Sequence, residues 1–317
     1  MVWLFVTVVD PWGMLPLSLP LPRVPVSTNA RYSMPMLATS PAFDSALVGT
    51  STSRLLRPEA LDRVMGGRFV NLSMNAATAW EQAQMVALFA RTHPAPRRVL
   101  FGLDLSWCAL APERSSGRDF PSWMYGGSRW AGYTRMMNLY AVQEAGSQLW
   151  IMLGLKRRRY GLDGYTSFVP PDDAYDPARV AAAFARPDLL GAVPAPNPAE
   201  RFPALPLLAD ALHNLPGGTR KLLFFAPAST VLQGAPGSDV ARAWAACKAQ
   251  VAALAGSVPN TVVADFLVPS PVTSDRSNYW DPLHFRTTIA DRIAADLARA
   301  EAGEDTPDGP VLKRHGP

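Results

Sequence analysis

The chain has 317 residues, 48% of them hydrophobic and 18% charged, so it is long enough to bury a large core and too apolar to be globally disordered. Its formal net charge of +4 is mild, and its one dense basic run (Lys-Arg-Arg-Arg, residues 156–159) accompanies no nucleic-acid-binding motif, so we expect no nucleic-acid partner. That run is either a solvated loop or a patch that attracts an anionic polymer or acidic lipid headgroups.

The N-terminal residues 1–9 are apolar, but nine residues are too few to cross a bilayer, which needs about 20. They are interpreted either as a buried strand or as the outer end of a membrane helix. Six prolines follow between Pro11 and Pro35, a spacing that disfavours helix and central strand and predicts an extended segment. Residues 1–40 are therefore predicted to form an N-terminal arm.

From Asp44 onwards, strand-like and helix-like segments alternate, which is typical of a parallel sheet covered on both faces. Strands are predicted at 44–48, 68–74, 98–105, 221–226 and 261–267, and helices at 57–65, 78–91, 241–255 and around Ile289, Ile293 and Leu297. These elements predict an α/β fold, a three-layer α/β/α sandwich, over residues 41–300. Residues 107–215 are too many for a simple crossover and are predicted to be a helical insertion with irregular loops. Residues 301–317 are predicted to be a polar, frayed tail.

Asp281 and His284 stand three residues apart in Tyr-Trp-Asp-Pro-Leu-His. An aspartate at this spacing can hold an imidazole in one tautomer, and a histidine so held can act as a general base. The alternative, a helix cap beside a surface imidazole, becomes less favoured because a candidate nucleophile exists upstream. Ser51 directly follows a predicted strand in Gly49-Thr50-Ser51, whereas Ser53 is expected to cap the helix after it.

These motifs resemble the first and last blocks of the SGNH (GDSL-type) esterases and acyltransferases, in particular membrane-anchored relatives such as alginate O-acetyltransferase-like and teichoic-acid D-alanylation proteins. The resemblance extends from about Asp44 to the helix after His284. It implies an SGNH-like fold and a catalytic triad of Ser51, His284 and Asp281.

Two intermediate blocks can also be compared with this family. The segment 68–78 resembles the second block, with Asn75 or Ala76 where a glycine usually lends its N–H to the oxyanion hole. The resemblance thus implies a hole built from the N–H groups of Ser51 and Ala76. Residues 99–105 resemble the third block, but Asp104 replaces the usual asparagine. An ionised Asp104 would repel an oxyanion, so either the backbone acts alone or Asp104 positions Ser51 or Arg54.

Two further residues near Ser51 have open roles. Thr50 replaces a frequent aspartate of the family. Arg54 either grips an anionic group of a substrate or serves as a structural partner of Asp104 or Asp281.

Aromatic residues around Trp123 form either a second small core or one wall of a substrate cleft. Cys247 lies on the apolar face of a predicted helix, and Cys108 is expected to be buried; the two do not decide the redox compartment.

The resemblance implies a serine esterase or O-acyltransferase that acts on acyl (acetyl) esters of a cell-surface carbohydrate or polymer, without a cofactor or metal. It further implies an extracytoplasmic location, a membrane anchor in a full-length form, and a membrane-bound acyltransferase as a partner. A cytoplasmic location stays open. The alternatives are a non-catalytic polymer-binding or scaffold protein and a lipid esterase.

Overall fold

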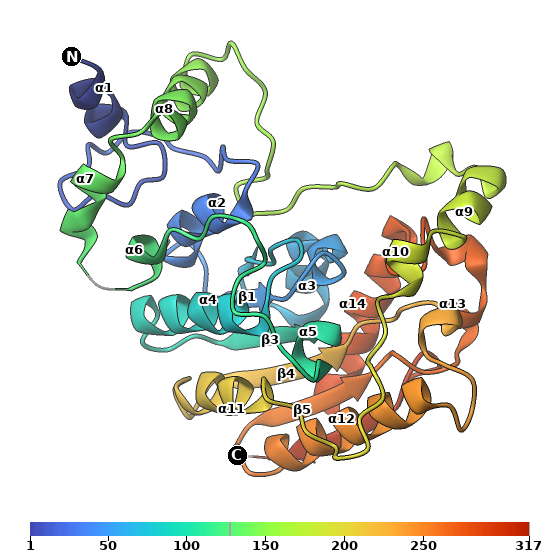
Figure 1. Ribbon diagram of the computed structural model, residues 1–317. Coiled ribbons are helices and arrows are strands. Elements are labelled where there is room, and N and C mark those ends of the chain that lie inside the picture. The colour runs from blue at the N-terminus through green and yellow to red at the C-terminus, as the bar shows by residue number, and fades with distance from the viewer. Residues whose placement is uncertain (127, 317) are drawn as a thin grey trace.

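The computed structural model describes residues 1–126 and 128–316, and at its centre lies a six-stranded sheet with the strand order β2-β1-β3-β4-β5-β6 (Figure 1). The first five of these strands are parallel, and β6 pairs antiparallel with β5. The strands are β1 (Ser45–Val48), β2 (Phe69–Asn71), β3 (Arg98–Leu103), β4 (Arg220–Phe225), β5 (Thr261–Asp265) and β6 (Val311–His315). Strand order 2-1-3-4-5 is that of a doubly wound sheet.

Helices cover both faces of this sheet. Helices α4 (Ala79–Thr92), α11 (Leu205–His213) and α12 (Asp239–Ala255) belong to the larger core cluster on one face, and α3 (Pro58–Met65) and α14 (Thr287–Ala302) belong to the second core on the other. Because β1, β2, β3 and β5 are buried along their whole length, they consist mainly of apolar residues rather than alternating ones. The predicted three-layer α/β/α class is confirmed.

The N-terminal segment differs from the prediction in part. Of the two interpretations of residues 1–9, the buried strand is wrong, because Val2–Val9 form a short helix, α1. Ala30–Ala38, within the segment predicted to be extended, form a second helix, α2, with Pro35 inside it. Asn29 begins α2 because its side chain accepts the N–H of Arg31. The prolines therefore exclude helix only between these two segments, and α2 packs against α4 as part of the larger core.

The insertion after β3 contains short helices, many of which lie at the periphery of the sheet. They are α5 (Leu105–Cys108), α6 (Ser122–Tyr125), α7 (Gly132–Arg135), α8 (Leu139–Met152), α9 (Pro177–Phe184) and α10 (Pro187–Leu190); α13 (Pro271–Ser274) comes after β5. In Figure 1, α1, α7 and α8 form a lobe at the upper left, whereas α9 and α10 lie at the right beyond a long connecting loop. Helix α1 packs against α8.

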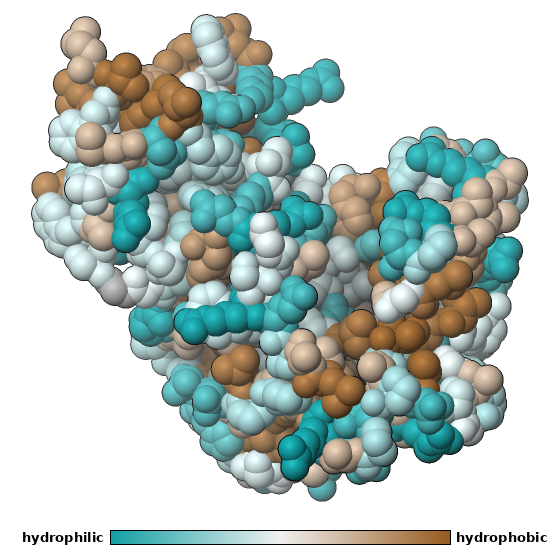
Figure 2. Space-filling model, in the orientation of Figure 1, coloured by the Kyte–Doolittle hydropathy of each residue, from teal (hydrophilic) through white to brown (hydrophobic). Residues whose placement is uncertain are grey.

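This upper-left lobe exposes large apolar side chains. Trp3 and Leu4 of α1 are 46% and 57% exposed, and Trp150 at the end of α8 is 52% exposed. Figure 2 shows apolar residues gathered at the top left, over α1 and α8. Within residues 1–126 and 128–316, no helix is both long and apolar enough to cross a membrane.

The expectation of a frayed tail after Glu301 is wrong. Residues 311–315 form β6, whose register joins Thr261 to His315 and Val262 to Arg314 at the edge of the sheet. Asp305 contributes by accepting the N–H of Val311 through its side chain. The final residue of the predicted tail, Pro317, lies outside the described residues.

Candidate active site

The turn after β1 carries Ser51. Its first residue, Gly49, is packed so closely that a Cβ there would lie 2.3 Å from the Ser53 Oγ. Ser53 is fully buried, and its hydroxyl finds no hydrogen-bond partner among the described residues. The side chain of Ser53 thus fills the space beneath the turn, which only glycine at position 49 permits. The prediction that Ser53 caps the following helix is wrong, since it begins the 3₁₀ turn Ser53–Leu55 without a side-chain cap.

The turn between Tyr279 and Phe285 carries the other two residues. These ends pair as an isolated antiparallel bridge, and the Trp280 N–H donates to the His284 carbonyl at 2.8 Å. Asp281 Oδ1 accepts the N–H groups of Leu283 at 2.8 Å and His284 at 2.9 Å. The three-residue spacing is therefore explained by a tight turn that the aspartate itself closes, and not by a helix.

Ser51, His284 and Asp281 form one continuous hydrogen-bonded chain. His284 Nδ1 lies 2.7 Å from Asp281 Oδ2, and His284 Nε2 lies 2.9 Å from Ser51 Oγ. With Nδ1–H donating to the carboxylate, Nε2 is the lone-pair nitrogen and accepts the serine O–H. Burial alone would raise the pKa of Asp281, but His284 and the two backbone N–H groups lower it below its ordinary value. The carboxylate is thus kept ionised beside the imidazole.

Ala76 lies next to this turn on the neighbouring strand connection. The N–H of Met74 donates to the Gly49 carbonyl at 3.0 Å, which ties the segment after β2 to the turn carrying Ser51. Ala76 has φ +52°, in the left-handed region that favours glycine. Among the described residues, no acceptor is found for the N–H of Ser51 or of Ala76, and both residues line the same cavity.

A buried ion pair fixes the Asn75–Ala76 turn. Arg31 of α2 donates to both carboxylate oxygens of Glu81, at 2.9 and 2.5 Å, and to the carbonyls of Asn75 at 3.3 Å and Ala76 at 3.2 Å. The Arg31 and Glu81 side chains are 1% and 0% exposed. Glu81 also closes the capping box that begins α4 with Thr78. The left-handed turn is thereby anchored through its carbonyl groups.

Asp104 contacts neither Ser51 nor Arg54. Its carboxylate instead accepts the Thr50 hydroxyl and, at 2.9 and 2.6 Å, the N–H and hydroxyl of Ser106. It begins α5 as the helix cap. Burial raises the pKa of Asp104 even though these hydrogen bonds oppose the shift. Asp104 therefore holds Thr50, the residue before Ser51, and its hydrogen bonds go to Thr50 and Ser106 rather than to Arg54.

Arg54 is 5% exposed, and within the described part of the chain no carboxylate lies within ion-pair distance of it. Of the two roles considered for Arg54, that of a structural partner of Asp104 or Asp281 is therefore wrong. Its guanidinium donates to the Asn75 side-chain oxygen at 3.0 Å and lies 5.0 Å from the ring centre of Tyr160 and 6.0 Å from that of Phe168. Phe168 in turn packs edge-on against His284, with ring centres 5.3 Å apart. Sequence reasoning did not identify Tyr160 or Phe168.

A cavity of about 510 Å³ opens beside Ser51 along the carboxyl ends of the strands. Its lining includes Thr50, Ser51 and Asp104 at one part and Ala228, Trp244 and Leu267 at another. Leu283 also lines it. In open α/β sheets, ligands bind at this edge.

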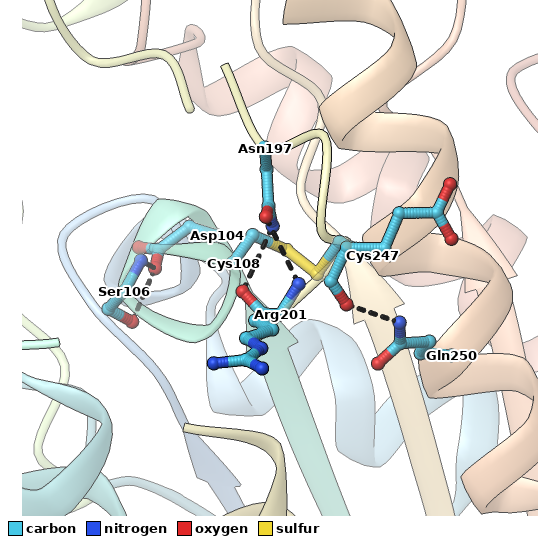
Figure 3. Close-up of a disulfide and its surroundings, with 8 residues drawn as sticks. Asp104, Ser106, Cys108, Asn197, Arg201, Cys247 and Gln250 are labelled. Atoms are coloured by element: carbon cyan, nitrogen blue, oxygen red, sulfur yellow. Dashed lines mark hydrogen bonds between the residues drawn. A yellow bond between two sulfur atoms is a disulfide. The ribbon is translucent and has the colours of Figure 1, made fainter. Parts of the chain in front are cut away.

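A disulfide joins Cys108 of α5 to Cys247 of α12, across 139 residues of sequence. Figure 3 shows that Asp104 and Ser106 lie on the same short segment as Cys108. The bond therefore ties the wall that carries Asp104 to α12, whose Trp244 lines the cavity. The sequence predicted both cysteines to be buried, which is confirmed at 1% and 0% exposure, but did not predict that they bond.

Comparison with known proteins gives little further information. No protein-family model and no curated protein matches the chain. Among solved structures, the chain is similar to the C-terminal catalytic domain of the Streptococcus pneumoniae peptidoglycan O-acetyltransferase A, solved with a methylsulfonyl adduct. The identity is 14%, the match covers 86% of this chain and 99% of that one, and the TM-score is 0.37. At this similarity, the chemistry of the chain has to be inferred from its own residues.

Proposed function

We propose that the protein is a serine esterase or O-acyltransferase in which Ser51 is the nucleophile. The observation that carries this proposal is the unbroken hydrogen-bonded chain from Ser51 Oγ through His284 to Asp281, with contacts of 2.9 and 2.7 Å. Such a chain at the carboxyl edge of a parallel sheet, beside a cavity, provides what acyl transfer requires: an activated hydroxyl and space for an acyl group.

In the proposed reaction, Ser51 Oγ attacks the acyl carbon of an ester while His284 Nε2 takes the hydroxyl proton. The tetrahedral intermediate collapses, the ester C–O bond breaks, and the leaving alcohol departs with the proton from His284. Water or an acceptor hydroxyl then attacks the acyl-serine, gives its proton to His284, and releases an acid or a new ester. Ser51 finally recovers its proton. Asp281 stabilises the imidazolium in both halves of the cycle.

The developing oxyanion would be stabilised by the N–H groups of Ser51 and Ala76. This assignment is supported by the absence, within the described residues, of another acceptor for either group. It is also supported by the anchoring of Ala76 through its carbonyl to Arg31, since a donor held in place costs no reorganisation during the reaction. Asp104 would support the site indirectly, by fixing Thr50.

The leaving alcohol would lie on the side of His284 where Phe168, Tyr160 and Arg54 gather. Phe168 is 38% exposed, and an accessible aromatic side chain suits a carbohydrate, whereas Arg54 beside it is 5% exposed. We therefore retain an acylated carbohydrate or polymer as the proposed substrate, and a membrane-bound acyltransferase as a proposed partner.

We also propose that the protein works outside the cytoplasm, in the periplasm or at the cell surface. The Cys108–Cys247 disulfide supports this location because such bonds persist in oxidising compartments. Association with a membrane would involve the lobe of α1 and α8, whose apolar side chains Trp3 and Trp150 are exposed. Trp150 is also close in sequence to the basic residues 156–159.

The proposal is tested by hydrolysis of p-nitrophenyl acetate and butyrate by the purified chain. Ser51→Ala and His284→Ala are expected to lower kcat by a factor on the order of 10⁴, because the two residues act as one unit. The control is Asp239→Asn, which removes an exposed carboxylate at the start of α12 and should leave kcat unchanged. Equal activity of wild-type protein, Ser51→Ala and His284→Ala would overturn the proposal and favour a binding or scaffold role.

A further inference from the structure

The cavity beside Ser51 is apolar to a degree that an acetyl group does not require. Fifteen of its 22 lining residues are alanine, leucine, tryptophan or proline, and its only charged lining residues among those described are Asp104 and Glu113. Eight are alanines, whose small side chains leave the space open. At about 510 Å³, the cavity falls in the range of pockets that enclose a whole small ligand.

The cavity is elongated across the ends of the strands. Ser51 follows β1, Ala228 follows β4 and Leu267 follows β5, so its walls extend across the ends of neighbouring strands in the order β1-β3-β4-β5. With neighbouring strands about 4.8 Å apart, these three intervals correspond to about 14 Å. A methyl group would occupy only the end next to Ser51, whereas an extended aliphatic chain would reach towards Leu267.

The far wall of the cavity consists of tightly packed apolar side chains. Leu232, Leu267 and Trp244 are each at most 5% exposed. The Trp244 indole N–H donates to the Leu232 carbonyl at 3.1 Å, so the tryptophan has no unsatisfied donor to place in the cavity. The disulfide between α5 and α12 joins two of these walls. A cavity held open in this way needs little ordering when an apolar chain enters.

The two sides of the nucleophile differ in chemistry. His284, which must protonate the leaving alcohol, is absent from the cavity lining as described and packs against Phe168, near Arg54 and Tyr160. The alcohol thus belongs on the side of His284 where Phe168 lies. The opposite side, where Ser51 and Ala76 meet the cavity, is left for the acyl group.

We propose that the cavity binds the acyl chain of the substrate, and that the preferred acyl group is an aliphatic chain of medium length rather than acetyl. This inference rests on the proposed function, because it requires Ser51 to be the nucleophile. In the steps given above, the chain stays in the cavity from attack by Ser51 until the acyl-serine is resolved, and only the alcohol and the acceptor exchange on the side of Phe168.

The test is the acyl-chain profile of the purified protein on p-nitrophenyl acetate, butyrate, hexanoate and octanoate. Burial of each CH₂ should raise kcat/KM about fourfold, so octanoate, which has six more CH₂ groups than acetate, should exceed it by on the order of 10³-fold when all six are buried. An acetate preference with little octanoate hydrolysis would overturn the inference and leave the proposed function intact. Hydrolysis of no ester, or hydrolysis unaffected by Ser51→Ala, would instead overturn the proposed function.

A variant that fills the cavity provides the second arm. Ala109 is partly exposed in the lining, so Ala109→Phe adds bulk without entering the sheet core; it should lower kcat/KM for octanoate at least about tenfold and leave acetate within about twofold. The matched control is Ala253→Phe on the exposed side of α12. If Ala109→Phe loses acetate hydrolysis too, Ala192→Phe in the same lining replaces it. An unchanged profile in a folded, acetate-active variant would contradict the assignment.

Discussion

Arg31 and Glu81 form a buried ion pair directly beneath the turn that carries Ala76, 50 residues apart in sequence. The pair links α2, in the N-terminal segment, to the first turn of α4. Because Arg31 also donates to the carbonyls of Asn75 and Ala76, the N-terminal segment contributes to the geometry of the proposed oxyanion hole. The segment predicted to be an N-terminal arm is thereby part of the site's support.

This pair leads to the first prediction. Glu81→Gln leaves the buried Arg31 charge without its partner and should lower the free energy of unfolding by about 3–5 kcal/mol. Arg31→Lys should also lower kcat, with KM little changed, because an ammonium cannot hold both the carboxylate and the two carbonyls. Urea unfolding and ester kinetics measure these effects. An Arg31→Lys enzyme with wild-type kcat would show that the turn is fixed without Arg31.

The second prediction concerns Ala76, whose left-handed φ of +52° is costly for a residue with a Cβ. Ala76→Gly should keep esterase activity. Glycine relieves the strain in the folded state but also increases the entropy of the unfolded chain, and these two effects oppose each other. The free energy of unfolding should therefore be unchanged or higher by up to about 1 kcal/mol. Ala76→Val should be destabilising and less active, since a β-branched side chain tolerates this conformation worst. Thermal unfolding and kcat together test this, and a stabilising Ala76→Val would contradict it.

The third prediction concerns pH. Burial raises the pKa of folded Asp104 above its ordinary value of 3.8. The folded state therefore holds this proton more tightly than the unfolded state, and ionisation costs stability as pH rises from about 3.8 through the folded pKa. Asp104→Asn should remove that decline while still bonding Thr50 and Ser106. Urea unfolding from pH 4 to 8 should show that the free energy of unfolding of the variant rises relative to that of the wild type as the pH increases.

Asp275→Asn is the control with the opposite sign. The pKa of Asp275 is lowered by its hydrogen bonds to Ser277, so its ionised form contributes stability above pH 3.8 that is lost as pH falls. Removing this charge should therefore lower stability near neutrality. If the Asp104→Asn curve runs parallel to the wild-type curve at every pH, Asp104 does not carry the raised pKa.

The fourth prediction concerns the disulfide. Removing the Cys108–Cys247 bond by a double substitution to alanine should cost about 2–5 kcal/mol, because the bond closes a loop of more than one hundred residues in the unfolded chain. Reductant should lower the Tm of the wild type and leave that of the double variant unchanged. The bond can be reduced under denaturing conditions that expose it. If the Tm of the wild type is unchanged after this reduction, the bond has no stabilising role.

Much of the α/β core could be predicted from the sequence because its signals are local. The apolar runs that become β1, β3, β4 and β5 and the periodicity of α4 and α12 fall close to their predicted positions. The Asp281–His284 contact was also foreseeable, because three residues fix it within one turn. The distance from Ser51 to His284 is set by the sheet order, which the alternation of elements constrains.

The rest depends on long-range contacts that have no local signature. Strand β6 was missed because its Lys, Arg and His residues read as a solvated tail, whereas an edge strand needs only one covered face. Charge suggested an ion pair as one alternative for Asp104 and Arg54. The fold instead offers Thr50 and Ser106 to Asp104, and Asn75 and Tyr160 to Arg54. The cavity results from alanines contributed by many separate segments, which no single window of sequence reveals.

The most direct test of the central claim is covalent labelling of the purified protein with a small fluorophosphonate, followed by peptide mass mapping. We predict one label per chain, on the peptide containing Ser51, with no label on Ser51→Ala and strongly slowed labelling of His284→Ala. Ser53→Ala, which keeps Ser51, should still be labelled if it folds. Absence of labelling in wild-type protein, under conditions that fully label a known serine esterase, would contradict the assignment of Ser51 as an activated nucleophile.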